Sequence, residues 1–192
     1  MYEGKLHRHR LPAVLVVGLL MGLLGGIGSP AHSARPAGSN IHLQVPGGFQ
    51  GPIRATPNPQ ATVTAYVKPY PERAGGTRLQ IAAYEVGAQL VELPEEQRGP
   101  AADSYLAEFL DGIASRQTSF ERAATTHLQL DGRPASMARW HGAADGKRVS
   151  GVMYTVVVGT RVILLHTQDV DPAPPENREA AIRAIESVTF SN

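Results

Sequence analysis

Two neighbouring segments in the C-terminal half of the sequence are apolar at consecutive positions, and no other feature constrains the fold as much. They read KRVSGVMYTVVV (147–158) and RVILLHTQ (161–168), and Gly159-Thr160 separates them. A β-strand with one face in water alternates apolar and polar residues, because successive side chains point to opposite faces. These two segments do not alternate. We therefore expect them to be the central strands of a sheet that is covered on both faces.

The residues before these segments predict that the sheet is an antiparallel meander. TTHLQL (125–130) is followed by Asp131-Gly132, and RPASMARWHG (133–142) is followed by AADG (143–146). Asp-Gly dipeptides accept positive φ angles at both positions and therefore form two-residue hairpin turns. The sequence predicts four consecutive antiparallel strands in this part of the chain.

Two segments have the periodicity of helices. They are AADSYLAEFLDGIASR (101–116) and PENREAAIRAIESVTF (175–190), and the second begins with Pro175, a residue suited to the first helical turn. Each has an apolar stripe at spacings of three and four residues. The stripes consist of Leu106, Phe109, Leu110 and Ile113 in the first helix and of Ala181, Ile182 and Ile185 in the second. Residues 188–190 are expected to return as a short terminal strand.

The N-terminal half predicts fewer elements. IHLQV (41–45) alternates and favours a strand, whereas the stretch after it, to Gln60, carries four prolines and is expected to be a loop. The runs 61–67 and 77–86 are expected to pair as a hairpin, and 87–100 fits a strand or a helix. The order is that of an α+β fold, an antiparallel meander with helices on both faces.

Residues 1–33 have the organisation of a secretory signal peptide. A basic front precedes an apolar run of 17 residues, 11–27, and Ala31-His32-Ser33 fits a small-x-small cleavage site. At about 1.5 Å per residue, a helix of that length barely crosses a hydrocarbon core of about 30 Å. We expect cleavage before Ala34, with cleavage after Ala31 or after Ala34 as alternatives, then a linker at 34–40 and a single α+β domain at 41–192. The alternative is an uncleaved anchor, which would bring the chain into contact with a membrane.

Composition excludes several classes of function. Without residues 1–33 the chain has 15 basic and 16 acidic residues, so it lacks the basic surplus that nucleic-acid binding requires. The sequence contains no cysteine, which excludes disulfides, thiolate metal sites and cysteine nucleophiles. The leader and the predominance of arginine over lysine together indicate the periplasm or the exterior of a bacterial cell.

This order of elements resembles the PsbP-like superfamily. The segments that carry the resemblance are IHLQVPGGF (41–49), LQLDGRPASMARW (128–140), YTVVVGTRVILLHTQD (154–169) and PENREAAIRAIESVTF (175–190). Members of the superfamily include a photosystem oxygen-evolving subunit, a small Ran-GTPase-binding import factor and bacterial exported proteins of unknown role. The resemblance implies the α+β fold for nearly the whole mature chain. It implies no catalytic residues, because the superfamily shares none.

Histidines and carboxylates are the candidate metal ligands. His42, His127, His141 and His166 have no helical ligand spacing and no HExxH motif, so each is expected to be a strand residue with a local hydrogen-bond partner. Asp169 and Asp171 near His166 could join a metal cluster, but a solvated turn fits them better. Glu92, Glu95 and Glu96 could supply paired carboxylates, but they fit a solvated loop. We expect no metal or cofactor.

The candidate binding residues lie around the only tryptophan. With Asp145-Gly146 as a two-residue turn, Trp140 faces Gly151, and with Gly159-Thr160 as the next turn, Met153 faces His166. Trp140, Met153, Leu164 and His166 would then form one cluster, either plain core or the floor of an apolar ligand cleft. Arg139, His141 and Tyr154 would project from the other face, either to hold an anionic ligand or to form a hydrogen-bond network.

No catalytic constellation is visible in the sequence. Ser150 precedes Gly151 but lacks the surrounding G-x-S-x-G motif, and the glycines at Gly25, Gly26 and Gly28 lie in the leader. The sequence therefore predicts a non-enzymatic exported module that binds another envelope protein through a sheet face or a mobile loop. A carrier of a small apolar or anionic ligand with a cleft near Trp140 is the alternative, and a hydrolase is the third hypothesis.

Overall fold

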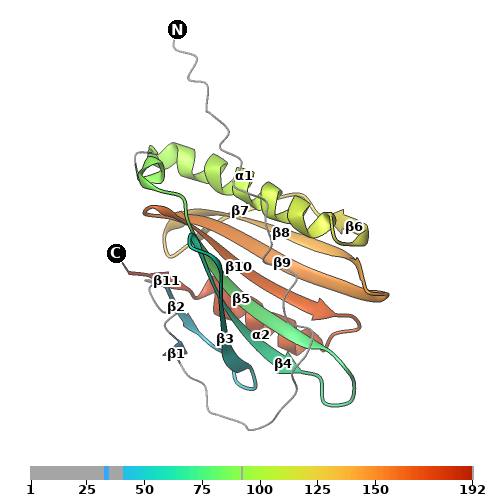
Figure 1. Ribbon diagram of the computed structural model, residues 1–192. Helices are drawn as coiled ribbons and strands as arrows, with labels where there is room; N and C mark the ends of the chain where they lie inside the picture. Colours follow the sequence, from blue (N-terminus) through green and yellow to red (C-terminus); the bar gives the residue numbers. More distant parts are fainter. Residues whose placement is uncertain (1–32, 35–40, 92, 192) are drawn as a thin grey trace.

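The computed structural model describes residues 33–34, 41–91 and 93–191, and these form an α+β fold (Figure 1). In chain order the elements are β1 (Ser33–Ala34), β2 (Ile41–Gln44), β3 (Gln50–Asn58), β4 (Ala61–Pro69), β5 (Gly76–Glu85), a 3₁₀ turn (Ala88–Leu90), α1 (Glu95–Ala114), β6 (Thr118–Arg122), β7 (Thr126–Leu130), β8 (Arg133–Ala144), β9 (Lys147–Val158), β10 (Arg161–Val170), α2 (Pro175–Glu186) and β11 (Thr189–Phe190).

Most of the strands belong to one antiparallel sheet. Its order is β3-β4-β5-β10-β9-β8-β6, with β7 also paired to β8, and a small second sheet has the order β1-β2-β11. The meander predicted from the sequence corresponds to β7, β8, β9 and β10, and the predicted hairpin corresponds to β4 and β5. Both predicted cross-strand pairs are confirmed, because Trp140 lies opposite Gly151 and Met153 lies opposite His166.

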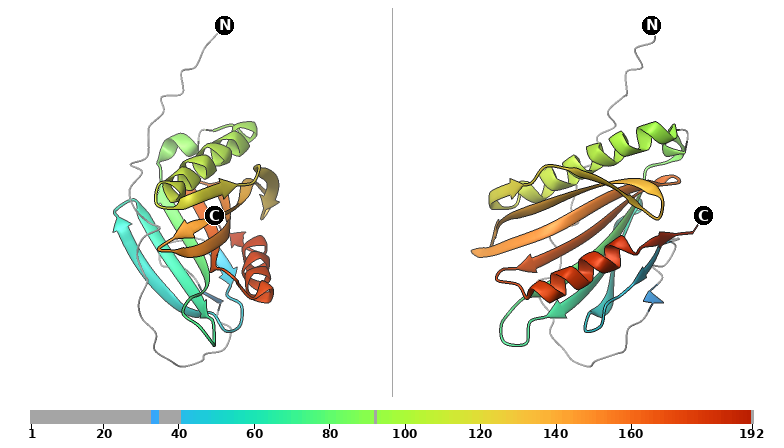
Figure 2. Two further views of the ribbon diagram at one scale, coloured as in Figure 1. Left: turned by 90° about the vertical axis from the view of Figure 1, so that its right-hand side faces the viewer. Right: turned by 180° about the vertical axis from the view of Figure 1, so that it is seen from behind.

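The two helices pack against different sets of sheet residues (Figure 2). α1 buries Leu106, Leu110 and Ile113 in a cluster that includes Met153 of β9. α2 packs against β10 and β5, and its Ile185 lies in a cluster with Tyr154 of β9. Met153 and Tyr154 are consecutive, so their side chains point to opposite faces of the sheet. This explains why the central strands are apolar at consecutive positions.

The expectation of a loop between Pro46 and Gln60 is wrong, because this segment contains the strand β3. β3 lies at the edge of the sheet, and its register with β4 shifts between Gln50 and Ile53 and again between Ala55 and Asn58. Each shift contains a proline, Pro52 or Pro57. Proline has no N–H group and is tolerated in a sheet only at edges and bulges, so proline-rich sequence and strand coexist here.

The first helix begins earlier than the sequence predicts. It starts at Glu95 instead of residue 101, and Pro100 lies inside it. Glu95 and Glu96 therefore lie in the first turn of a helix, near its positive end, and the expectation that they lie in a loop is wrong. Glu92 lies outside the described residues. The short edge strand β6 was also missed, because TSFER is exposed and shows no apolar alternation.

The predicted signal peptide and linker lie almost entirely outside the described residues. Only Ser33–Ala34 of this region is described, as the short strand β1 paired with β2. Cleavage before Ala34 and the division at residues 34–40 thus stay predictions. Among the described residues, neither helix combines the length and the apolar character needed to cross a membrane.

Candidate binding surface

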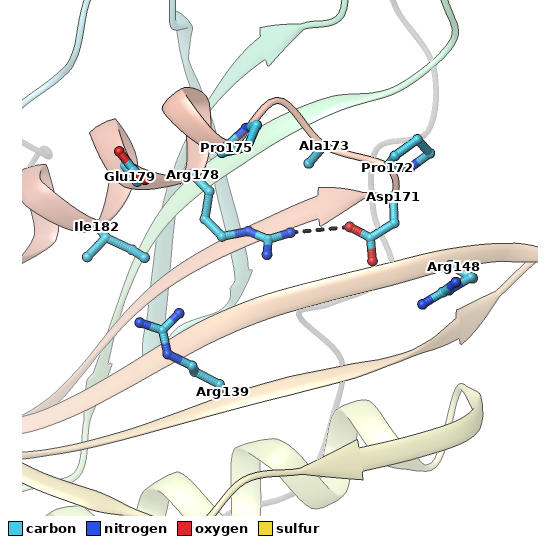
Figure 3. Close-up of a pocket in the computed structure, with 9 residues that line it drawn as sticks. All are labelled: Arg139, Arg148, Asp171, Pro172, Ala173, Pro175, Arg178, Glu179 and Ile182. Carbon is cyan, nitrogen blue, oxygen red and sulfur yellow. Dashed lines mark hydrogen bonds and ion pairs between the residues drawn. The ribbon is translucent and has the colours of Figure 1, made fainter.

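A hollow of about 800 Å³ lies between the N-terminal end of α2 and the strands β8 and β9 (Figure 3). Three arginines from three elements reach it: Arg139 from β8, Arg148 from β9 and Arg178 from α2. The remaining lining residues are Asp171, Pro172, Ala173, Pro175, Glu179 and Ile182. The volume is in the range of natural ligand sites, about 300–1,000 Å³.

The helix α2 places Arg178 toward the sheet. Pro175 at the start of the helix supplies a fixed φ angle suited to the first turn. Arg178 precedes the buried Ala181 and Ile185 by three and seven residues, so it continues their stripe toward the helix N-terminus. A charged residue in the buried stripe of a helix needs a partner on the surface below it.

That partner is Asp169, whose side chain is 0% exposed. Its carboxylate accepts hydrogen bonds from Arg178 Nε at 2.5 Å, Thr77 Oγ1 at 2.5 Å and Tyr70 OH at 3.3 Å. Arg178 Nη2 also donates to Asp171 Oδ1, at 3.2 Å. Burial by itself lowers the pKa of Arg178, but the hydrogen bonds and negative charges of Asp169 and Asp171 outweigh burial and raise the pKa. The network fixes α2 on the sheet and forms the floor of the hollow.

The other two arginines of the hollow differ from Arg178, because they are exposed and form no ion pair with any described residue. Within the described residues, no carboxylate lies within ion-pair distance of Arg139 or Arg148. The acidic lining residues are already engaged: Asp171 accepts hydrogen bonds from Arg178 and Ser150, and Glu179 pairs with Arg183 at 3.6 Å. The hollow therefore presents two uncompensated positive charges.

The cluster around Trp140 is packed core. Trp140, Met153, Leu164 and His166 are all buried on the α1 side of the sheet, and the Trp140 ring stacks on His166 with a centroid distance of 5.7 Å. The pairing predicted from the sequence is thus correct. The structure supports the core interpretation of the cluster, since a ligand would have to displace packed side chains to reach the tryptophan.

Arg139, His141 and Tyr154 share the opposite face of the sheet, as expected, but they do not form one network. His141 Nε2 lies 3.3 Å from Glu121, and Tyr154 donates a hydrogen bond to Glu186 at 3.0 Å. Only Arg139 reaches the hollow. The anionic-ligand interpretation therefore still applies to Arg139. The other positive residues at the hollow are Arg148 and Arg178, not His141 and Tyr154.

The four candidate histidines are strand residues, and His42 and His127 have the expected hydrogen-bond partner, whereas His141 lies within ion-pair distance of a carboxylate. His42 Nε2 lies 3.1 Å from Ser191 Oγ, His127 Nε2 lies 2.9 Å from Asp103, and His141 pairs with Glu121. The expectation is wrong for His166, whose Nε2 is buried without a hydrogen-bond partner in the described part of the chain. Those residues contain no group of three or more potential ligands that could hold a metal ion.

The buried His166 predicts a specific pH dependence of stability. Burial and the nearby charge of Arg78 lower the pKa of His166 to about 3, whereas an unfolded histidine has a pKa of about 6.5. Below pH 6.5 the unfolded chain binds a proton that the folded protein does not, so stability falls as pH falls. Between pH 7 and pH 5 we expect this group to cost about 2 kcal/mol.

The test is urea denaturation of the wild type and of His166→Gln at pH 7, 6 and 5. The difference in unfolding free energy between the two proteins should change by about 2 kcal/mol over this range, with the wild type losing more. If the unfolding free energies of the two proteins changed with pH to the same extent, His166 would bind its proton as strongly in the folded state as in the unfolded state.

Asp169 and Asp171 do not form the solvated turn that the sequence suggested. Asp169 lies in β10 and is fully buried against Arg178, and Asp171 accepts a hydrogen bond from Ser150 at 2.9 Å. Ser150 also accepts one from Arg178 Nη2. Ser150 is thus part of the ion-pair network, and its described hydrogen bonds are to Arg178 and Asp171.

Sequence reasoning missed Arg148 and Arg178. A signal for Arg178 was present, because an arginine that continues an apolar helical stripe predicts a buried carboxylate opposite it. No such signal exists for Arg148, which is one exposed residue near a turn. Its place in the hollow follows from the return of the chain as α2 over β9.

Comparison with known proteins gives the fold. No protein-family model matches the sequence, and no curated protein matches it significantly. Among solved structures, the cyanobacterial PsbP (CyanoP) of Synechocystis sp. PCC 6803 is similar, with a TM-score of 0.58, 10% identity and coverage of 89% of this chain and 99% of that one.

Two further solved structures are bacterial. LpqN of Mycobacterium tuberculosis, described as involved in cell envelope biogenesis, has a TM-score of 0.55, 17% identity and coverage of 86% of this chain and 87% of that one. PA94 of Pseudomonas aeruginosa, a protein of unknown function described as a putative regulator, has a TM-score of 0.53, 12% identity and coverage of 85% and 99%. At these identities the similarity shows the fold alone, and the chain has a PsbP-like fold.

Proposed function

We propose that this chain is an exported, non-enzymatic accessory module of the bacterial cell envelope that binds a partner protein through the arginine-lined hollow. In this proposal α1 and α2 cover opposite faces of the sheet, so the interior serves only stability. The binding site then lies on the outer surface of the protein. The hollow at α2 is the site because it combines concavity with unpaired charge.

One observation carries the proposal: Arg139 and Arg148 line a hollow without any carboxylate partner in the described residues. Most exposed arginines gain little from surface ion pairs, so a single unpaired arginine has no meaning by itself. Arg139 and Arg148, however, line one concave surface, and Arg178 between them is already neutralised. A partner with negative charge complements this arrangement.

The comparisons are compatible with this role. The description of LpqN places that protein in cell envelope biogenesis, and the description of PA94 calls it a putative regulator. Neither description names an enzyme activity. A PsbP-like fold with a leader-like N-terminus and without a catalytic motif fits an accessory protein better than a hydrolase.

Site-specific photo-crosslinking in cells tests the proposal. A photo-reactive amino acid is placed at Ala173 in the hollow, in the full chain expressed in a bacterial host, and the periplasmic and membrane fractions are analysed. We expect a discrete crosslinked product with one partner. The matched control carries the same probe at Ser104, an exposed position on α1 that is not among the residues lining the hollow.

The product should weaken when the Ala173 probe is combined with Arg139→Gln and Arg148→Gln. Both arginines are exposed, so the double variant is expected to fold normally. Identical products from Ala173 and Ser104, or none from Ala173, would exclude the hollow as the partner's site.

A further inference from the structure

We infer that the occupant of the hollow is an extended acidic peptide segment whose carboxylates meet Arg139 and Arg148. This inference rests on the proposed function, because it names the chemistry of the partner at the same site. It follows from the spacing of the unpaired charges, from a free donor between them and from the apolar residues of the lining.

The register of the sheet sets the spacing of the two arginines. Arg139 lies opposite Val152, and Arg148 lies opposite Ala143 on the same pair of strands. The two positions are thus four residues apart along β8 and β9, which corresponds to about 13 Å at roughly 3.3 Å per residue. Figure 3 shows their guanidinium groups at opposite ends of the hollow, with Arg178 and Asp171 between them.

This spacing favours an elongated ligand over a single small anion. In an extended peptide, side chains four residues apart point to the same side and are separated by about 13 Å. Two carboxylates at such positions can each receive a charge-assisted hydrogen bond from one arginine. A lone phosphate or carboxylate would leave one of the two guanidinium groups unpaired.

The middle of the hollow suits the backbone of such a peptide. The hydrogen bonds that Arg178 makes to Asp169, Asp171 and Ser150 use its Nε and Nη2 atoms, so Nη1 is left to donate. A peptide carbonyl between the two carboxylates is the matching acceptor.

The remaining lining adds apolar contact and discriminates against polyanions. Pro172, Pro175 and Ile182 offer apolar surface for a side chain between the two acidic residues. The two unpaired arginines are separated by engaged acidic residues, so the hollow offers no continuous basic surface to a nucleic acid or an anionic membrane, whereas a peptide with two spaced carboxylates matches it.

Fluorescence anisotropy with defined peptides tests the inference. The probe is a labelled nine-residue peptide with Glu at its third and seventh positions, Leu at its fifth, and Gly or Ser elsewhere. One control peptide has Gln in place of both Glu residues, and a second has the two Glu residues adjacent. The protein is the full chain, measured at low ionic strength.

We expect the spaced Glu peptide to bind at least about tenfold more tightly than the Gln peptide and more tightly than the adjacent-Glu peptide. Arg139→Gln combined with Arg148→Gln should reduce the Glu-to-Gln difference below about twofold. Replacement of Arg139 and Arg148 by lysine should retain part of the Glu-to-Gln difference in affinity. Arg122→Gln, which removes an arginine paired with Asp111 outside the hollow, should leave it unchanged.

Several outcomes would overturn the inference. They are equal affinities for the Glu and Gln peptides, no preference for the spaced over the adjacent Glu peptide, and a Glu-to-Gln difference that survives in the double variant. Displacement of the peptide by equimolar inorganic phosphate or by phosphatidylglycerol vesicles would assign the hollow to those ligands instead. A specific crosslink at Ala173 without any carboxylate preference would refute only the inference, whereas the absence of that crosslink refutes the proposed function.

Discussion

Replacement of Arg178 by methionine should lower the free energy of unfolding by about 3 kcal/mol or more. Asp169 is completely buried, and Arg178 is the only positively charged group that forms an ion pair with it in the described residues. Methionine removes the cation and leaves the carboxylate in the core with only the hydroxyl groups of Thr77 and Tyr70 as donors. Urea denaturation at pH 7, followed by circular dichroism, measures the effect.

The matched control is Arg183→Met on the same helix. Arg183 pairs with Glu179 at 3.6 Å, but its side chain is 68% exposed, so the change should cost less than about 0.5 kcal/mol. Adding Asp169→Asn to Arg178→Met removes both charges and should recover part of the loss. If Arg178→Met costs no more than Arg183→Met, the ion pair does not hold α2 on the sheet.

Replacement of Gly151 by valine should destabilise the protein by about 3 kcal/mol, because there is no room for a side chain opposite Trp140. A Cβ atom at this position would lie 2.6 Å from the carbonyl oxygen of Thr167 and 2.7 Å from Trp140 Cζ2. Both neighbours are fixed, one by the β-ladder and the other by its packing between Phe120 and His166. Thermal and urea denaturation measure the loss.

Gly112→Ala provides a control of opposite sign. Gly112 lies in α1, and a Cβ atom there would have no neighbour within 4 Å. Alanine should therefore stabilise the protein by about 0.5–1 kcal/mol through its higher helix propensity. Stabilities of Gly151→Val and wild type that agree within 0.5 kcal/mol would mean that the sheet accommodates the side chain by moving Trp140.

The central sheet could be predicted from the sequence because its information is local. Asp145-Gly146 and Gly159-Thr160 are two-residue turns, and a turn of known length fixes which residues face each other across a hairpin. The pairing of Trp140 with Gly151 follows from the first turn. The consecutive apolar residues of the central strands likewise predict burial without knowledge of what covers them.

The errors in the fold arose where tertiary context overrides a local signal. Prolines argue against a strand, but Pro52 and Pro57 occupy the bulges of an edge strand, where no ladder bond is lost. The sequence predicts a helix that begins at residue 101, directly after Pro100, whereas α1 begins at Glu95. Proline lacks one N–H donor and crowds the preceding turn, and α1 nevertheless continues through Pro100, near its N-terminus.

The hollow could not be predicted, because it depends on contacts between distant parts of the chain. The sequence analysis selected Arg139 because it lies on the sheet face opposite the Trp140 cluster, and Asp169 because it is close to His166 in sequence. The roles of both residues depend on where α2 lies. The order of helix and strand cannot specify that Arg178 reaches Asp169 and leaves Arg148 unpaired. Burial was consequently misjudged for Asp169, since a sequence position near a turn says little about what packs over it.

The prolines of β3 also determine how this sheet meets other molecules. An outer strand with a full row of N–H groups is a template on which the sheet of a second copy can grow, and such growth leads to fibrils. At Pro52 and Pro57 these donors are absent, and the register irregularities distort the strand around them. These two features disfavour edge-to-edge pairing of β3 with a second copy of the chain.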